Sequence, residues 1–353
     1  MNPTRILRID FLNIKDEDIR EAADSIRAGQ LVIIPTETVY GIAVNMLQEK
    51  AVQKLYEIKQ RPKDKPFSIA IEKKDRIDEF SRDVPITAYK LAGKFWPGPL
   101  TLVLHGIDQP SVGLRMPDDE IALRIIGETM APVLLPSANL SGKPAPVNFE
   151  AALKDLNGLV DLAIDAGPVK LGIESSIVDL RSESLQIPRV GTISREDILR
   201  AARSKNILFI CTGNSCRSVI AEALFKKMLQ EQKRNDVEVA SAGVMTISGL
   251  AASQGAKMIL SRQGIDVSGH ISQEVTPGMI KRSDLILVME RAHEKEILKI
   301  VPEAKNRVFL LREFAKIEGN ELDIADPMGK SLDFYEQTFI NIQEALERVI
   351  KLI

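Results

Sequence analysis

The chain has 353 residues, of which 44% are hydrophobic, 27% charged and 5% aromatic. This length predicts about two domains, and the composition excludes a disordered or fibrous chain. The 47 Lys and Arg residues nearly balance the 49 Asp and Glu residues, so the formal net charge is −2. This balance argues against a polybasic nucleic-acid-binding protein. No apolar run reaches the roughly 18 residues of a membrane span, and the N-terminal residues lack the apolar stretch of a secretory signal. We therefore expect a cytoplasmic protein without a membrane partner.

Metal-ligating residues are scarce. The chain contains two cysteines, Cys211 and Cys216, and three histidines, His105, His270 and His293. Two cysteines cannot form a disulfide framework, and this small set makes a Cys/His zinc site improbable. We expect no metal site formed by the protein alone.

The first part of the chain mixes strand-like and helix-like patterns. Short apolar runs are interrupted by Pro and Gly, as in residues 30–44 and 132–139, and residues 49–60 have an amphipathic helical spacing. The absence of strict alternation predicts an α/β domain with an open, twisted sheet. Residues 194–206 predict a helix with Ser194 as its N-cap.

After residue 204, strands and helices alternate regularly. Strands are predicted at 206–210, 237–243, 284–289 and 307–311, and helices at 219–231, 250–264, 293–301 and 331–353. This alternation predicts a four-stranded, parallel, doubly wound sheet. The sequence thus predicts an α/β protein with two domains, 1–203 and 204–353.

The segment 207–225, ILFICTGNSCRSVIAEALF, contains the most informative motif. An apolar strand ends at Cys211, five residues follow, and Arg217 and Ser218 open a helix. Backbone N–H groups and the helix N-terminus at such a junction form an anion site. Arg217 adds a planar cationic fork that suits phosphate oxygens. A buried structural role for Cys211 is the simpler alternative, but the full C-x5-R-S string favours a nucleophile in a phosphate loop.

Residues 206–350 resemble the low-molecular-weight phosphotyrosine phosphatase family. CTGNSCRS matches its phosphate loop, and ADPMGKS (325–331) matches its Asp-Pro loop. The resemblance implies that Cys211 attacks phosphorus, that Arg217 binds the phosphoryl oxygens and that Ser218 hydrogen-bonds the thiolate. It also implies that Asp326 protonates the leaving group and then activates water, without a metal.

Two features within this resemblance concern the substrate. Ser215 stands where tyrosine phosphatases of this family usually have a bulky aliphatic residue, and Met328 and Gly329 replace aromatic residues after Asp-Pro. The protein-arginine phosphatase branch is more similar, so we expect phosphoarginine to be preferred over phosphotyrosine in a phosphorylated protein substrate. Arsenate reductases of this fold need more cysteines than the two in this chain, which argues against that class of enzyme. Cys216 has two interpretations, a protective reversible disulfide with Cys211 or a structural role.

Three polar segments in the first domain point to an anionic ligand. The pattern of residues 34–44 predicts a strand with a hydroxyl-rich turn that includes Thr36. Residues 58–66 carry four cations, and two prolines, Pro62 and Pro66, interrupt this charged segment. In the Ser/Gly-rich loop 136–146, Ser137 and Asn139 point the same way if the chain is extended. Each segment alone is also typical of a solvated surface loop.

Together these segments resemble the YrdC-like threonylcarbamoyl-AMP synthase family over residues 10–200, with K-x-R at Lys59 and Arg61 and S-x-N at Ser137 and Asn139. The resemblance implies that ATP, L-threonine and bicarbonate condense to threonylcarbamoyl-AMP with release of pyrophosphate, and that Mg²⁺ accompanies ATP. It also implies a role in tRNA threonylcarbamoyladenosine formation, with the transfer machinery as a partner. The residues implied to contact ATP are Lys59, Ser111, Asn139 and Arg189. Those implied to contact threonine are Thr36, Arg115, Ser137 and Ser175, and Arg61 completes the basic wall.

The leading interpretation is a bifunctional fusion of a synthase and a phosphatase. One alternative makes the first domain a non-catalytic nucleotide- or RNA-binding module, with only the phosphatase active. Another makes the second domain a phosphate-sensing module.

Overall fold

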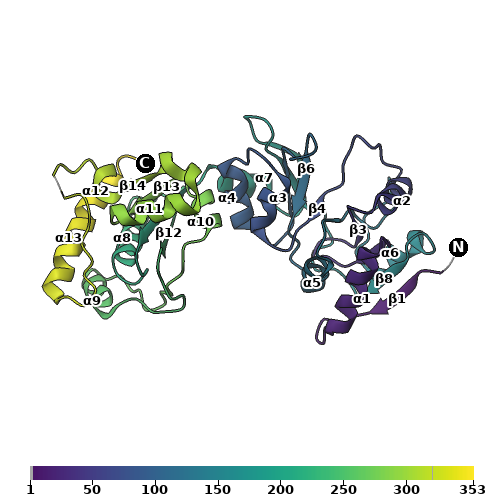
Figure 1. Cartoon of the computed structure of the whole chain (residues 1–353), viewed down its shortest axis with the longest axis horizontal. Helices are drawn as coiled ribbons and strands as arrows, with labels where there is room; N and C mark the ends of the chain where they lie inside the picture. Colours follow the sequence, from purple (N-terminus) through teal and green to yellow (C-terminus); the bar gives the residue numbers. More distant parts are fainter. Residues whose placement is uncertain (1–2, 320) are drawn as a thin grey trace. The chain divides into compact units, whose positions relative to one another are not determined.

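A computed structural model describes residues 3–319 and 321–353, and the chain divides into two compact units, Met1–Ala201 and Ala202–Ile353. The division falls two residues before the boundary that the sequence predicts, within a helix that leads directly into the first strand of the second unit. Both units mix helices and strands (Figure 1).

The N-terminal unit contains one mixed, ten-stranded sheet in the order β1-β8-β2-β3-β7-β4-β6-β5-β9-β10. Its strands are β1 (Arg5–Arg8), β2 (Val32–Ile34), β3 (Gly41–Asn45), β4 (Ile69–Ala70), β5 (Leu100–Leu104), β6 (Val112–Arg115), β7 (Val133–Leu134), β8 (Leu162–Asp165), β9 (Ser176–Asp179) and β10 (Gln186–Arg189). Its helices are α1 (Asp16–Arg27), α2 (Glu49–Lys59), the 3-10 helix η1 (Lys74–Arg76), α3 (Ile77–Phe80), α4 (Ile86–Phe95), α5 (Glu120–Thr129), α6 (Phe149–Leu156) and α7 (Arg195–Arg203).

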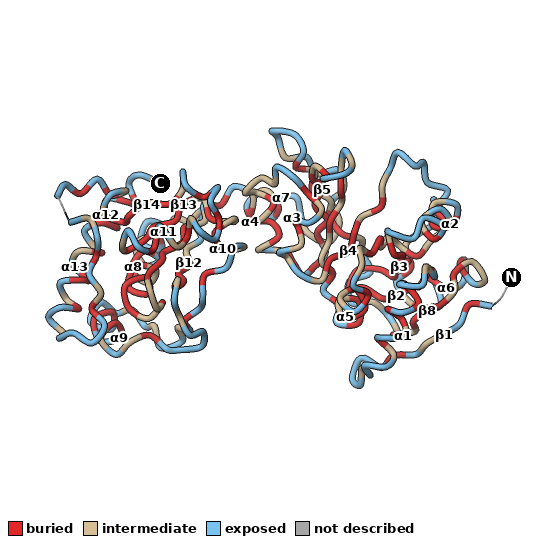
Figure 2. The backbone as a smooth tube through the Cα atoms, viewed as in Figure 1, coloured by how far each residue is buried: buried red, intermediate tan, exposed pale blue. Residues whose placement is uncertain are grey.

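Parallel and antiparallel neighbours alternate irregularly in this sheet. β2 pairs parallel with β8 and antiparallel with β3, and β5 pairs parallel with β9 and antiparallel with β6. The open, mixed arrangement agrees with the interspersed strand and helix patterns of the sequence. One core cluster joins α1 and α5 to the buried strands β2 and β8, for example through Ile26, Ile125 and Ile164 (Figure 2).

The predicted helix at 49–60 is α2. Ser194 caps α7, as predicted, by accepting a hydrogen bond from the Asp197 N–H at 3.1 Å.

The C-terminal unit contains a four-stranded, fully parallel sheet in the order β12-β11-β13-β14. Its strands are β11 (Lys205–Cys211), β12 (Val237–Gly243), β13 (Leu285–Val288) and β14 (Val308–Leu310). Its helices are α8 (Arg217–Glu231), α9 (Gln254–Arg262), α10 (Pro277–Arg282), α11 (Arg291–Ile300), the 3-10 helix η2 (Pro302–Arg307), α12 (Leu311–Phe314) and α13 (Leu332–Val349). The doubly wound prediction is confirmed. The sequence missed α10 and α12, which are too short to show a helical period.

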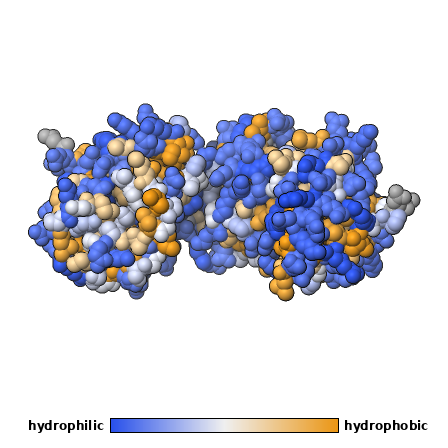
Figure 3. All heavy atoms as spheres, turned by 60° about the horizontal axis from the view of Figure 1, so that its bottom comes forward, coloured by the Kyte–Doolittle hydropathy of each residue, from blue (hydrophilic) through white to orange (hydrophobic). Residues whose placement is uncertain are grey.

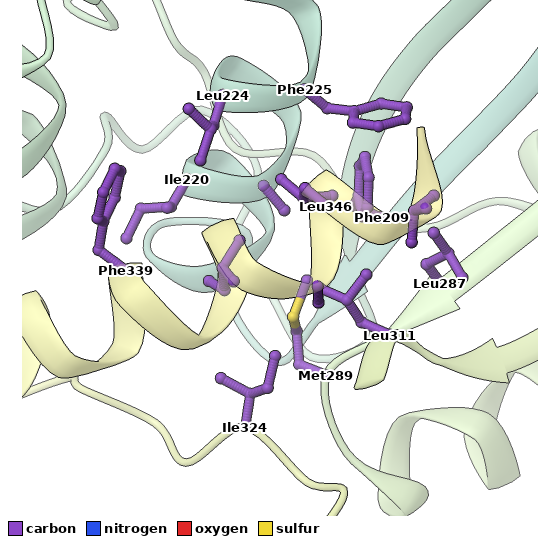
Figure 4. Close-up of a cluster of buried hydrophobic side chains, with 14 of the residues drawn as sticks. Phe209, Ile220, Leu224, Phe225, Leu287, Met289, Leu311, Ile324, Phe339 and Leu346 are labelled. Carbon is purple, nitrogen blue, oxygen red and sulfur yellow. The ribbon is translucent and has the colours of Figure 1, made fainter. Parts of the chain in front are cut away.

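Helices cover both faces of this sheet, which explains the continuous apolar run of β11. Phe209 faces a cluster that includes Phe225 of α8 and Leu346 of α13, whereas Leu208 and Ile210 face a cluster that includes residues of α10 and α11. Successive strand side chains alternate between faces, so a strand that is buried on both sides must be apolar throughout. Figure 4 shows the first cluster. The Phe209 and Phe225 rings pack edge to face, with their centroids 5.8 Å apart. This packing fixes the strand end where Cys211 lies.

Candidate functional sites

The loop between β11 and α8 is the candidate phosphate site. Cys211 ends β11, and Ser218 is the second residue of α8. The Cys211 Sγ and Ser218 Oγ atoms are 3.0 Å apart. Asn214 Nδ2 donates to the same Ser218 Oγ at 3.0 Å. Because this bond occupies a lone pair of the hydroxyl, the Ser218 proton is available for donation to the Cys211 sulfur.

A buried asparagine holds the shape of this loop. Asn214 is fully buried, has a left-handed backbone (φ 48°) and donates through Nδ2 to Ser241 Oγ at 2.8 Å. Its Oδ1 accepts the Gln273 N–H at 3.0 Å. Gly243, at the end of β12, lets the backbone of the loop pass close by, because a Cβ at this position would lie 2.6 Å from the Thr212 carbonyl oxygen. The loop is thus pre-organised by partners on its own unit.

Arg217 is 1% exposed and lies between two carboxylates, those of Glu290 and Asp326. Its Nη2 donates to Asp326 Oδ2 at 2.6 Å, and its Nη1 donates to Glu290 Oε1 and to the Ile324 oxygen. Its Nε is buried and has no hydrogen-bond partner. An unpaired, buried guanidinium N–H is costly, and an oxyanion would satisfy it. The structure therefore brings Arg217 and Asp326 together, as it does Cys211 and Ser218.

Ser215 and Cys216 belong to the same loop as Cys211 but have different surroundings. Both cysteines are free thiols. Cys216 Sγ contacts Ser253 Oγ at 3.1 Å and Tyr335 Oη at 3.4 Å. Ser215 Oγ lies 3.7 Å from Cys216 Sγ. Cys216 is therefore integrated into the packing beneath the loop, whichever redox role it has.

Sequence reasoning missed Glu290 and two further residues near Arg217, Thr212 and His293. Glu290 lies two residues after the end of β13, and α11 starts one residue later. The carboxyl ends of neighbouring parallel strands meet at one edge of a sheet. A carboxylate at this position was therefore a usable signal for proximity to Cys211.

The second candidate site is a cavity of about 460 Å³ in the N-terminal unit. Of the predicted ligand residues, it is lined by Thr36, Lys59, Arg61, Arg115, Ser137, Asn139, Ser175 and Arg189. These residues come from strand ends, from the end of α2 and from loops that are distant in sequence, which only the sheet brings together. Ser111 is not in the lining. It precedes β6, whereas Arg115 ends that strand, so the two lie about 13 Å apart at 3.3 Å per residue.

Lys59 joins the two signature motifs. Its Nζ donates to the Ser137 oxygen at 2.8 Å, to the Asn139 oxygen at 2.7 Å and to Asn139 Oδ1 at 2.9 Å. Burial, and secondarily the positive charge of Arg61, lower the pKa of Lys59 to about 8. Arg61 braces its own loop by donating to the Lys65 and Pro66 oxygens. The cavity thus has a cationic wall.

Two further arginines face the same cavity. Arg115 Nη2 forms an ion pair with Glu37 Oε1 at 2.8 Å and donates to Thr38 Oγ1 at 2.7 Å, while its buried Nε has no partner. Arg189 donates to the Ser175 oxygen at 2.9 Å and pairs with Glu174. These cations suit a ligand that carries phosphate and carboxylate groups.

The two sites define two classes of protein domain, a cysteine phosphate-loop domain and an open-sheet domain with a cationic pocket. The Sua5/YciO/YrdC family model, described as "Telomere recombination", matches residues 24–191, and the model "Low molecular weight phosphotyrosine protein phosphatase" matches residues 206–353.

Individual relatives agree with both models. The putative threonylcarbamoyl-AMP synthase of Methanocaldococcus jannaschii is 32% identical over 207 residues, which cover 56% of this chain and 97% of that protein. The probable low molecular weight protein-tyrosine-phosphatase EpsP of Ralstonia nicotianae is 38% identical over 143 residues, covering 40% of this chain and 92% of that protein. The chain therefore belongs to the threonylcarbamoyl-AMP synthase family in its N-terminal part and to the low molecular weight protein phosphatase family in its C-terminal part.

Longer synthases are matched over only part of their length. The threonylcarbamoyl-AMP synthase of Pyrococcus abyssi is 40% identical over 196 residues, which are 52% of this chain and 57% of that protein. The chain likewise covers 58% of the Bacillus subtilis enzyme. The crystal structure of P. abyssi Sua5 complexed with L-threonine is similar in fold, with a TM-score of 0.55 at 24% identity. The match covers 98% of this chain and 98% of that chain.

The face of the molecule in Figure 3 is mostly hydrophilic, with small apolar areas. Among the described residues, no helix is both long and apolar enough to cross a bilayer.

Proposed function

We propose that the chain is bifunctional, with threonylcarbamoyl-AMP synthesis in the N-terminal unit and protein dephosphorylation in the C-terminal unit. The first activity would join L-threonine, bicarbonate and ATP, release pyrophosphate and supply the threonylcarbamoyl-transfer step of tRNA modification. The observation that carries this proposal is the Lys59 contact with both residues of the S-x-N motif inside one cationic cavity.

In this mechanism, the N-terminal residues act by positioning and charge neutralisation. Lys59, Asn139 and Arg189 would bind the nucleotide, with Arg61 on the loop beside them. Arg115 would pair with the threonine carboxylate, with Thr36, Ser137 and Ser175 around the amino acid. In the described residues no cluster of three or more His, Cys, Asp or Glu side chains could hold a metal. Mg²⁺ usually keeps several waters and is held by substrate phosphates together with one or two carboxylates, so it would enter this cavity with the ATP phosphates.

The direct test of the synthase is pyrophosphate release from ATP by the full chain. We expect release that requires both threonine and bicarbonate. If the folded protein binds ATP but releases no pyrophosphate, the N-terminal unit is a nucleotide-binding module and the synthase proposal is wrong.

ATP affinity should fall as the pH rises through about 8. Lys59 is positively charged below its pKa of about 8 and loses this charge above it. We expect the Kd for ATP, measured by titration calorimetry, to rise by up to about tenfold per pH unit above this value. Lys59→Arg keeps a charge at all these pH values and should remove most of the dependence. An equal pH dependence in both proteins would contradict the role of Lys59.

In the C-terminal unit, the Cys211 sulfur would form a bond to phosphorus while the bond from phosphorus to the leaving group breaks. Asp326 would give its proton to that leaving group. Asp326 would then take a proton from water, whose oxygen displaces the Cys211 sulfur and releases phosphate. Arg217 and the loop amides would bind the phosphoryl oxygens throughout. The close approach of Ser218 to Cys211 and of Asp326 to Arg217 carries this proposal.

We further propose that phosphoarginine is preferred over phosphotyrosine, because Ser215 leaves a small polar position beside the loop and Met328 and Gly329 supply no aromatic wall. Ser215→Ile should lower kcat/KM for a phosphoarginine peptide relative to a matched phosphotyrosine peptide by about tenfold or more. Turnover of a small aryl phosphate serves as the control for an intact loop. An unchanged ratio would exclude Ser215 as the selector.

A further inference from the structure

Thr212, the residue after Cys211, has a hydroxyl with two identified partners. Its Oγ1 lies 2.9 Å from His293 Nε2 and 3.2 Å from Arg217 Nη2. A guanidinium has no acceptor, so Arg217 donates in the second of these bonds. The direction of the first bond depends on the protonation of His293.

The surroundings of His293 determine which ring nitrogen carries its proton. The Glu290 backbone N–H donates to His293 Nδ1 at 3.1 Å, so Nδ1 carries no hydrogen. The neutral ring therefore has its proton on Nε2 and donates it to Thr212 Oγ1.

The neutral ring is also the favoured form. His293 is 2% exposed, and burial together with the positive charge of Arg217 lowers its pKa. Glu290, Asp323 and Asp326 act in the opposite direction, more weakly. With His293 and Arg217 both donating, the two lone pairs of the Thr212 hydroxyl oxygen are occupied. Its own proton then has only one use, which is to be donated.

We infer that the Thr212 hydroxyl is a further hydrogen-bond donor to the phosphoryl group, and that His293 is the positioning residue that orients it. This inference rests on the proposed phosphatase function. Thr212 adjoins the nucleophile in the chain and contacts the same Arg217 Nη2 that binds Asp326. A donor whose orientation is set before substrate arrives needs no reorganisation in the transition state, where phosphoryl oxygens need stabilisation.

The test compares hydrolysis of a small aryl phosphate by the full chain and its variants. Thr212→Val keeps the shape and removes the hydroxyl, and we expect kcat/KM to fall about 100-fold. His293→Phe should cost less, about tenfold, because the hydroxyl remains but is no longer oriented. His293→Gln, whose amide can still donate, should recover part of that loss.

Thr246→Val is the matched control. Thr246 also holds the loop by donating to the Gly213 oxygen at 2.8 Å, but this bond already uses its proton. We expect a much smaller loss than for Thr212→Val. An equal loss in both variants would mean that either hydroxyl only supports the loop and would overturn the inference.

A double-mutant cycle isolates the coupling. If His293 acts through Thr212, the double variant should be no slower than Thr212→Val alone, whereas additive losses would overturn the positioning role. If the wild type is active and Thr212→Val is equally active, this inference is refuted but the proposed phosphatase function is not. Absence of cysteine-dependent turnover in the wild type would instead refute the proposed phosphatase.

A second measurement does not depend on the folding of a variant. In ¹⁵N spectra of the wild-type full chain near neutral pH, His293 should appear as the neutral tautomer protonated at Nε2. Its long-range coupling pattern distinguishes this form, and the chain has only three histidines to assign. A ring protonated at Nδ1 would overturn the inference.

Discussion

Cys211→Ser is expected to lower cysteine-dependent hydrolysis of an aryl phosphate by about 10⁴-fold or more. A serine hydroxyl has a far higher pKa than a thiol. The serine of this variant therefore stays un-ionised at neutral pH, even with Ser218 and Arg217 nearby, and cannot act as an anionic nucleophile. The Ser218 contact at 3.0 Å is geometrically available to a serine oxygen as well, so the fold and the phosphate cradle should persist. Initial rates together with phosphate binding would separate lost chemistry from lost binding.

Cys216→Ser is the matched control for this result. Cys216 contacts Ser253 and Tyr335 beneath the loop, and a serine can keep these polar contacts. We expect this variant to retain most of the activity. If Cys216→Ser loses as much activity as Cys211→Ser, or if Cys211→Ser retains turnover, the assignment of the nucleophile is wrong.

The second large effect is expected in the synthase cavity. Lys59→Met should reduce threonine-dependent pyrophosphate release by about 100-fold or more, because an apolar side chain replaces the cation that we propose binds the nucleotide phosphates. The substitution also removes the three donors that fasten Lys59 to Ser137 and Asn139. The loop 136–146 should then be less ordered, in addition to the loss of the Lys59 charge from the cavity. Steady-state pyrophosphate release at saturating bicarbonate would measure the effect.

Lys63→Met provides the comparison for Lys59. Lys63 lies on the same cationic segment but is exposed and does not line the cavity. Its replacement removes the same formal charge, and we expect at most a small change. Similar losses in both variants would show that the general charge of the segment, rather than the position of Lys59, supports the reaction.

The sequence alone determined much of the C-terminal fold. Residues 207–211 of β11 are continuously apolar because helices cover both faces of the sheet. Such strand segments alternate with helical patterns along the chain, and this alternation predicts a parallel, doubly wound sheet. The segment that begins at the end of β11 contains the proposed nucleophile Cys211, Arg217 and the start of a helix within eight residues. A site built on one strand–loop–helix junction is local, and local sites are readable from a sequence.

The N-terminal sheet was less readable. Its ten strands are short, and the neighbour pairs β7-β4, β4-β6 and β5-β9 join segments that are far apart in the chain. Sequence patterns indicated strands but not which of them are neighbours. The prediction that Ser111 contacts ATP came from the resemblance, and its place at the opposite end of β6 from Arg115 leaves it outside the cavity lining.

The length predicted about two domains, and the composition showed a near-neutral charge and two cysteines. The sequence motifs then indicated a chemistry for each half. Only the tertiary structure decided the details that depend on contacts across the chain. It placed Glu290 and His293 beside Arg217, and it set Lys59 between Ser137 and Asn139. The physical reason is that hydrogen bonds and burial act over a few ångströms, whereas residues brought within that range by a sheet are separated by many tens of positions in the sequence.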